Sequence, residues 1–178
     1  MSMKNHFYAV LAISSILLCV SCNFADSVVA NYHYSIGSSK RKSGNLEEAI
    51  LEYSKAIHSN KKHHKAYASR GSAYFDLKDY PNAINDYSKA ICIDPKNAEV
   101  YTYRGRTYYE CDSIELALAD YNKAIQLNDK LAIAYYQRGL LRFTNKDLAG
   151  GCEDFKNAAD LGDEESTETV TKYCKEFL

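Results

Sequence analysis

A seven-residue segment recurs along this chain at a fixed interval. The segment LEYSKAI, Leu51 to Ile57, returns 34 residues later as NDYSKAI and after another 34 residues as ADYNKAI. A fourth and weaker copy, EDFKNAA, begins at Glu153. A period of about 20–50 residues is typical of arrays in which each unit packs only against its neighbours. The repeat therefore predicts four copies of one small structural unit.

The segments align the chain into units with shared small and aromatic positions. The units span residues 30–63, 64–97, 98–131 and 132–165. The first half of each unit carries a glycine, at Gly37, Gly71, Gly105 and Gly139. The second half carries an aromatic residue, at Tyr53, Tyr87, Tyr121 and Phe155. These positions lie on two stripes of helical spacing with a break between them, so each unit is predicted to be two helices of about a dozen residues.

This pattern resembles the tetratricopeptide repeat family over residues 30–165. The resemblance implies an all-α fold, a right-handed superhelical α-solenoid of four helix pairs. One pair cannot bury both of its faces, so residues such as Ile57, Ile91 and Ile125 should pack against the next unit. The last unit then needs a lid, and residues 166–178, with apolar residues at helical spacing, are predicted to form a capping helix.

The first residues follow a different pattern. The run FYAVLAISSILLCV, from Phe7 to Val20, carries no charge and follows a basic start. As a helix it would reach about 21 Å, short of the roughly 30 Å hydrocarbon core of a bilayer. Such a run is typical of an export signal, and we predict a signal peptide over residues 1–21.

Cys22 follows this run directly and suggests a lipid anchor. Ser21 precedes it and Leu18 lies four residues back, which resembles a bacterial lipoprotein signal, although Cys19 stands where Leu, Val or Ile is usual. The resemblance implies lipidation at Cys22, a short linker over residues 22–29 and a place in the bacterial cell envelope, with membrane contact only through this N-terminus. Three alternatives stay open: cleavage near Ala25 or Ala30, an uncleaved anchor, and a cytosolic adaptor with an uncleaved N-terminus.

Charged residues recur beside the glycine and aromatic positions. An arginine precedes three of the glycines, at Arg70, Arg104 and Arg138, and an acid precedes each aromatic, at Glu52, Asp86, Asp120 and Asp154. Pairing within units, as Arg70 with Asp86, would leave Glu52 unmatched. Pairing across units at a spacing of 18 uses every charge. We favour the second scheme, with the pairs Glu52–Arg70, Asp86–Arg104, Asp120–Arg138 and Asp154–Lys172, and expect it to set the register between units.

The cysteines beyond the signal predict one disulfide. Cys152 and Cys174 have their midpoint at Asp163, in the expected turn before the lid, so they would lie level on antiparallel helices. Cys92 and Cys111 would be offset by about 15 Å along the helix axis, beyond the roughly 7 Å Cα limit. We predict a Cys152–Cys174 disulfide that fastens the lid; the alternative is two small buried thiols.

No residue pattern points to catalysis. The adjacent His63 and His64 lie in a basic turn without acidic or thiol partners, which favours a solvated turn over a metal site. A net charge of −1 gives no indication of nucleic-acid binding. Charge is uneven, at +4 over residues 31–65 and −5 over residues 153–178, which leaves self-association open. We expect a non-enzymatic protein without cofactor or metal.

The family resemblance instead implies a concave groove lined by the first helix of each unit. A groove with aromatic walls suits an extended peptide or a partner helix. The residues carried onto this face are Tyr34, Arg41, Lys42, Lys65, Phe75, Arg106, Tyr109, Tyr136, Leu140 and Phe143. Some relatives hold a peptide carboxylate with Lys and Asn side chains, and only Arg106 among the corresponding positions here could do so. The predicted role is a protein-protein interaction scaffold.

Overall fold

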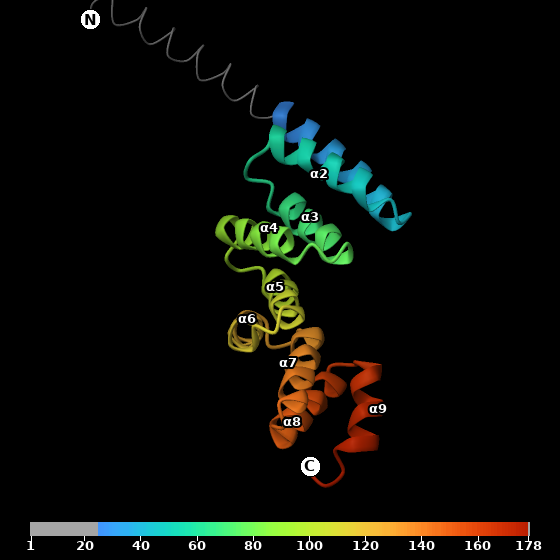
Figure 1. The fold of residues 1–178 in the computed structure, drawn as a ribbon, viewed down its shortest axis with the longest axis vertical. Coiled ribbons are helices and arrows are strands. Elements are labelled where there is room, and N and C mark those ends of the chain that lie inside the picture. Colours follow the sequence, from blue (N-terminus) through green and yellow to red (C-terminus); the bar gives the residue numbers. More distant parts are fainter. Residues whose placement is uncertain (1–24, 178) are drawn as a thin grey trace, which may run out of the picture.

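The computed structural model describes residues 25–177, and every regular element in this part is a helix (Figure 1). A leading helix covers residues 25–42. It is followed by α2 (Leu46–Ser59), α3 (His64–Asp76), α4 (Tyr80–Ile93), α5 (Ala98–Glu110), α6 (Ile114–Leu127), α7 (Ala132–Thr144), α8 (Leu148–Asp160) and α9 (Glu164–Tyr173).

The helices form pairs, and the pairs stack into an elongated array. The leading helix packs on α2, α3 on α4, α5 on α6 and α7 on α8, and each second helix also contacts the first helix of the following unit. Figure 1 shows these pairs succeeding one another along the long axis. Helices α3, α5 and α7 begin at the predicted unit starts, His64, Ala98 and Ala132. The predicted α-solenoid of helix pairs is confirmed.

Each pair closes where its glycine meets the aromatic ring of the second helix. A Cβ atom added to Gly105 would lie 2.8 Å from a ring carbon of Tyr121 and 3.2 Å from the carbonyl oxygen of Ala117. Cβ contacts under about 3 Å essentially never occur, so a larger residue would force the two helices apart. The ring itself is fully buried. The glycine therefore sets the short distance between the helices.

Neighbouring units pack along the apolar edge that the sequence predicts. Ile57 of α2, 6% exposed, clusters with Ala66 of α3 and with the rings of Tyr34 and Tyr67. Ile125 of α6 packs in the same way against a cluster that joins α5, α6 and α7. Burying one such side chain contributes about 1.5–3 kcal/mol, which no single unit could gain alone.

Turns between the helices are defined by local hydrogen bonds. The side chains of Asp79, Asn97, Asp147 and Asp163 each accept a hydrogen bond from the backbone N–H three residues on, which caps the helix that follows. His63 caps α3 through its Nδ1, which accepts from the N–H of Ala66. These caps fix where most of the helices start.

The ends of the array differ from the predicted boundaries. Residues 25–29, predicted as linker, are helical and continue into the leading helix. Helix α9 begins two residues earlier than the predicted cap and ends at Tyr173. The predicted signal peptide and Cys22 lie outside the described residues. Within residues 25–177 no helix combines the length and apolarity that a bilayer crossing requires.

Candidate functional site

The arginines pair with the acids of their own units, so our preferred pairing across units was wrong. Arg70 donates from Nε and Nη2 to the two carboxylate oxygens of Asp86, at 2.7 and 2.8 Å. Arg104 makes the same bidentate pair with Asp120, and Arg138 with Asp154. The carboxylates are almost fully buried, and the hydrogen bonds from the carboxylate raise the pKa of Arg70. The acids and arginines flank the glycine–aromatic contact, which brings them together within one unit.

The same arginines still connect neighbouring units, through hydroxyl and amide groups. Arg70 Nη1 donates to Ser54 Oγ of the preceding unit at 2.8 Å. The equivalent bonds run from Arg104 to Ser88 and from Arg138 to Asn122. Each guanidinium thus joins the two helices of its own unit to the second helix of the unit before. Register between units depends on these neutral acceptors.

The two ends of the predicted charge ladder find other partners. Glu52 bonds to Lys55 at 2.6 Å and to His33 at 2.7 Å, and these two contacts hold its carboxyl pKa below the usual value. Lys172 lies over the ring of Tyr173 at 4.9 Å and makes no described ion pair with Asp154. Asp154 instead accepts a further bond from Arg142 at 2.9 Å.

The lid is fastened by the predicted disulfide. Cys152 of α8 is bonded to Cys174 just after α9, with a Cα–Cα distance of 5.4 Å, and both residues are fully buried. Cys92 and Cys111 are free and exposed, as expected from their offset. The bridge places α9 against α8, in the position that the first helix of a fifth unit would take.

This lid removes three predicted groove residues from the open surface. Tyr136, Leu140 and Phe143 pack against the cluster that holds the disulfide, together with Val170 of α9. The Tyr136 hydroxyl donates to Glu165 at 2.5 Å, and burial raises the pKa of Tyr136 to about 12. Their expected role as groove lining is therefore wrong for this structure, because α9 occupies that space.

An open cleft of about 460 Å³ lies nearer the N-terminal end, between the leading helix, α3 and α5. It contains five of the predicted groove residues: Tyr34, Arg41, Lys65, Phe75 and Arg106. Of the other two, Lys42 is exposed but is not part of the lining. Tyr109 packs instead against the cluster around Ala117 and Leu141.

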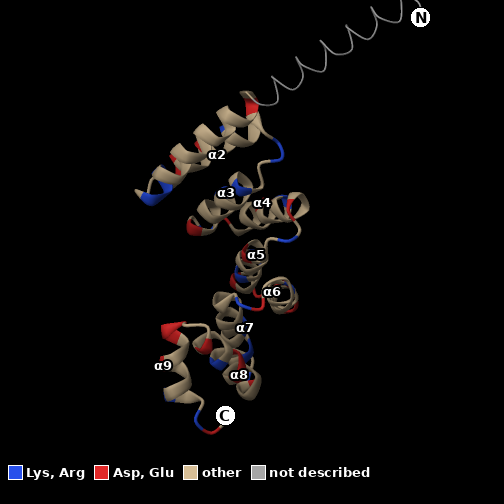
Figure 2. Ribbon diagram, turned by 180° about the vertical axis from the view of Figure 1, so that it is seen from behind, with Lys and Arg blue, Asp and Glu red and all other residues tan. Residues whose placement is uncertain are grey.

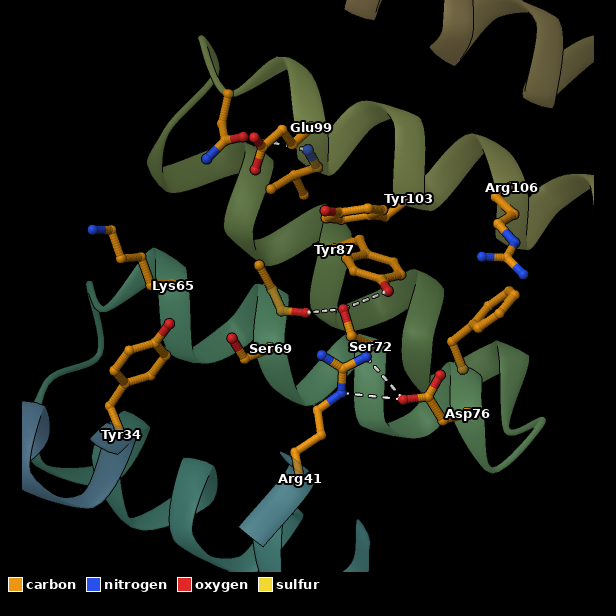
Figure 3. Close-up of a pocket in the computed structure, with 14 residues that line it drawn as sticks. Tyr34, Arg41, Lys65, Ser69, Ser72, Asp76, Tyr87, Glu99, Tyr103 and Arg106 are labelled. Atoms are coloured by element: carbon orange, nitrogen blue, oxygen red, sulfur yellow. Dashed lines mark hydrogen bonds and ion pairs between the residues drawn. The ribbon is translucent and has the colours of Figure 1, made fainter. Parts of the chain in front are cut away.

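Figure 3 shows how the cleft is built. Tyr87 and Tyr103 lie near each other in the middle, with ring centroids 6.1 Å apart. The Tyr87 hydroxyl donates to Ser72 Oγ at 3.1 Å, and burial raises the pKa of Tyr87 to about 12. The Tyr103 ring is 40% exposed, so a ligand can contact it.

Charged groups border these rings and are held in place. Arg41 of the leading helix donates from Nε and Nη2 to Asp76 of α3, at 3.1 and 2.9 Å. The Arg106 guanidinium lies 4.7 Å from the centroid of the Phe75 ring. Glu99 and Lys65 complete the rim. The cleft therefore combines aromatic faces with fixed positive and negative groups, which suits recognition of a peptide with mixed character.

Sequence reasoning missed part of this lining, notably Ser69, Tyr87, Val100 and Tyr103. One signal was present for Tyr103: it lies four residues after Glu99 and three before Arg106, on the same helical face. Nothing in the sequence pointed to Tyr87, which reaches the cleft from the second helix. Within residues 25–177 no three potential ligand side chains gather into a metal site.

Comparison with known families identifies the repeats. A family model described as "TPR repeat" matches residues 71–111 and 105–146, and one described as "Tetratricopeptide repeat" matches residues 30–63. Together these matches cover more than half of the chain. A comparison with curated protein sequences finds no match.

Solved structures agree with this assignment. PilF of Pseudomonas aeruginosa superposes with a TM-score of 0.78 at 20% identity, over 85% of this chain and 70% of its own. MamA of Desulfovibrio magneticus RS-1 does so with a TM-score of 0.69 at 22% identity, over 79% and 81%. The first TPR of Spaghetti (RPAP3), bound to the HSP90 peptide SRMEEVD, gives 0.59 at 28% identity, over 64% and 91%. The first two likenesses show the fold alone. The chain belongs to the tetratricopeptide repeat family, whose helical arrays serve as protein-interaction scaffolds.

Proposed function

We propose that this protein is a non-enzymatic scaffold that binds an extended segment of a partner protein in the cleft between the leading helix, α3 and α5. The observation that carries the proposal is the cleft itself, an open concave surface with the exposed Tyr103 ring and fixed charges around it. The Spaghetti (RPAP3) repeat domain is similar to this chain and holds a peptide, which supports the same kind of ligand here.

The side chains that would contact a ligand are already ordered. Arg41 is held by Asp76 and Arg106 by the ring of Phe75, so little side-chain freedom remains to be lost on binding. Ordering one long side chain at an interface costs about 0.5–1.5 kcal/mol, and this cleft largely avoids that cost. Ser69 and Ser72 offer hydroxyls to a peptide backbone beside the rings. The cleft is therefore preorganised for binding.

A matched pair of tyrosine variants tests this role. Tyr103→Ala removes an aromatic face from the cleft, while Tyr32→Ala removes one that is 63% exposed on the leading helix outside it. We expect Tyr103→Ala to reduce crosslinked recovery of the partner from membranes about 30-fold, the effect of losing an aromatic hot spot of about 2 kcal/mol. Tyr32→Ala should leave recovery unchanged. Equal losses in both variants would exclude the cleft as the binding site.

We also propose that the protein is exported and tethered through a lipid on Cys22. The uncharged run before Cys22 and the adjacent small Ser21 support this proposal. The Cys152–Cys174 disulfide is a second support, because such bonds persist in oxidising compartments. Intact-mass analysis of the protein purified from its native membrane tests it. A mature chain that begins at Cys22 with added acyl mass is expected, and an unmodified Met1 terminus would refute it.

Self-association is the second candidate, and it is favoured by exposed apolar residues at both ends. Val28 and Tyr32 are exposed on the leading helix, and Tyr173 and Phe177 near the C-terminus. Acidic residues gather at the start of α9 (Figure 2), whereas the stretch 31–65 is basic. Head-to-tail stacking would then give a sedimentation coefficient that rises with protein concentration and falls with salt. A constant value would exclude it.

A further inference from the structure

A hydrogen bond beneath the concave face recurs in the first two units. The hydroxyl of Tyr53 donates to Ser38 Oγ at 3.4 Å, and that of Tyr87 donates to Ser72 Oγ at 3.1 Å. In each case the serine lies on the first helix of the unit, 15 residues before the aromatic. The fourth unit has Leu140 and Phe155 at these positions, so both polar groups are absent together. Replacing both partners by apolar groups leaves no polar atom unsatisfied.

The third unit departs from this pattern. Arg106 stands where the serine is expected, while Tyr121 keeps its hydroxyl. Tyr121 is 0% exposed, and its hydroxyl has no hydrogen-bond partner among residues 25–177. Burial of this side chain raises the pKa of Tyr121 far above its ordinary value. An unpaired buried hydroxyl destabilises the folded state, so its presence in one unit of four calls for a compensating role.

Arg106 itself points away from Tyr121 and toward the cleft. Its guanidinium lies over the Phe75 ring of α3 and lines the end of the cleft beside Asp76 (Figure 3). Asp76, the nearest acidic lining residue in this view, is already bound by Arg41. Within the described part of the chain Arg106 makes no ion pair. A fixed guanidinium without a carboxylate partner is suited to bind one from outside.

We propose that Arg106 determines specificity in the cleft by binding an acidic side chain or terminal carboxylate of the peptide, and that the hydrogen bond of Tyr121 is lost to place it there. This inference rests on the proposed peptide-binding function. A purely structural role is the competing explanation, in which Arg106 ties α5 to α3 through the Phe75 ring. The two explanations predict opposite changes in stability when Arg106 is replaced.

The informative substitution is Arg106→Ser, which restores the serine–tyrosine pair of the first two units. The new hydroxyl would accept from Tyr121, and we expect the thermal midpoint to rise by about 2–4 °C. If Arg106 were a structural clamp, the midpoint would fall instead. Lys42→Ser is the matched control, since it removes one positive charge from an exposed position outside the cleft lining. It should change neither stability nor binding.

Selection from a random decapeptide library displayed on phage tests the binding side. The wild-type protein should enrich peptides with Asp or Glu at one fixed position, and Arg106→Ser should weaken the best of them at least 10-fold, as measured by fluorescence anisotropy. Arg106→Lys should retain part of the affinity. Equal binding of acidic peptides by Arg106→Ser would overturn the inference. Enrichment of peptides without a fixed acid would also overturn it but leave the proposed function intact, whereas no enrichment at all would refute both.

Discussion

Replacing Asp86 by alanine should lower the free energy of unfolding by about 3–4 kcal/mol. The substitution removes two charge-assisted hydrogen bonds, at 2.7 and 2.8 Å, from Arg70. Each such bond contributes about 1.5–3 kcal/mol, and breaking a buried pair costs about 3–5 kcal/mol. The Arg70 side chain is 19% exposed and keeps its bond to Ser54, so water and the serine relieve part of the penalty. The lower half of that range follows.

At about 2–4 °C per kcal/mol for a chain of this size, the thermal midpoint should fall by about 6–16 °C. Circular dichroism of the disulfide-intact protein measures this shift. Arrays of repeats can unfold in parts, so hydrogen exchange over α3 and α4 should be followed in parallel. Exchange should accelerate most in these two helices, because they lose the bond that joins them.

A double-mutant cycle separates the two pairing schemes. The coupling energy of Asp86 with Arg70 should be about 2 kcal/mol or more, while that with Arg104, which binds Asp120 instead, should stay under about 0.5 kcal/mol. A larger coupling to Arg104 would refute the observed pairing. Loss of less than about 1 kcal/mol in the single Asp86 variant would show that water replaces the carboxylate without penalty.

Three further predictions concern the lid, a helix cap and a close contact. Cys174→Ser should cost about 3 kcal/mol and raise amide exchange across α9 but not α3; uniform exchange would contradict this. Burial lowers the pKa of His63, so the unfolded chain binds the proton first, and stability should fall as pH drops below about 6.5; His63→Asn should keep the cap and remove this fall in the thermal midpoint. Gly105→Ala should destabilise by about 1–3 kcal/mol in denaturant titrations, despite the better helix propensity of alanine.

The periodic residues predicted the fold because they mark the same contact in every unit. Gly71 must face a ring and Ile57 must face the next unit, and no other arrangement buries both. The ion pairs were harder, because spacings of 16 and 18 both fit the sequence. The contact of Gly71 with Tyr87 has a spacing of 16, and its flanking residues, Arg70 and Asp86, share it. Taking these neighbours together would have given the correct pairing.

The candidate site was predicted only in part, for two physical reasons. The sequence identified a capping helix but not its reach, and α9 covers Tyr136 and Phe143 through Glu165 and Tyr173. Side chains from second helices can also reach the concave face, as Tyr87 does, and their depth depends on how closely the glycine lets the pair approach. Neither quantity can be obtained from spacing along one helix.

The three-way arginine contacts constrain how such an array could be lengthened or shuffled. Arg104 needs an acid in its own unit and a hydroxyl or amide in the unit before, as Asp120 and Ser88 provide. A unit inserted before residue 98 must therefore bring its own arginine and aspartate and also end with an acceptor at the position of Ser88. A module designed from the 34 residues alone, without regard to the preceding helix, would leave a guanidinium unsatisfied at the new junction. The interchangeable piece of this protein is thus a helix triplet rather than a single repeat.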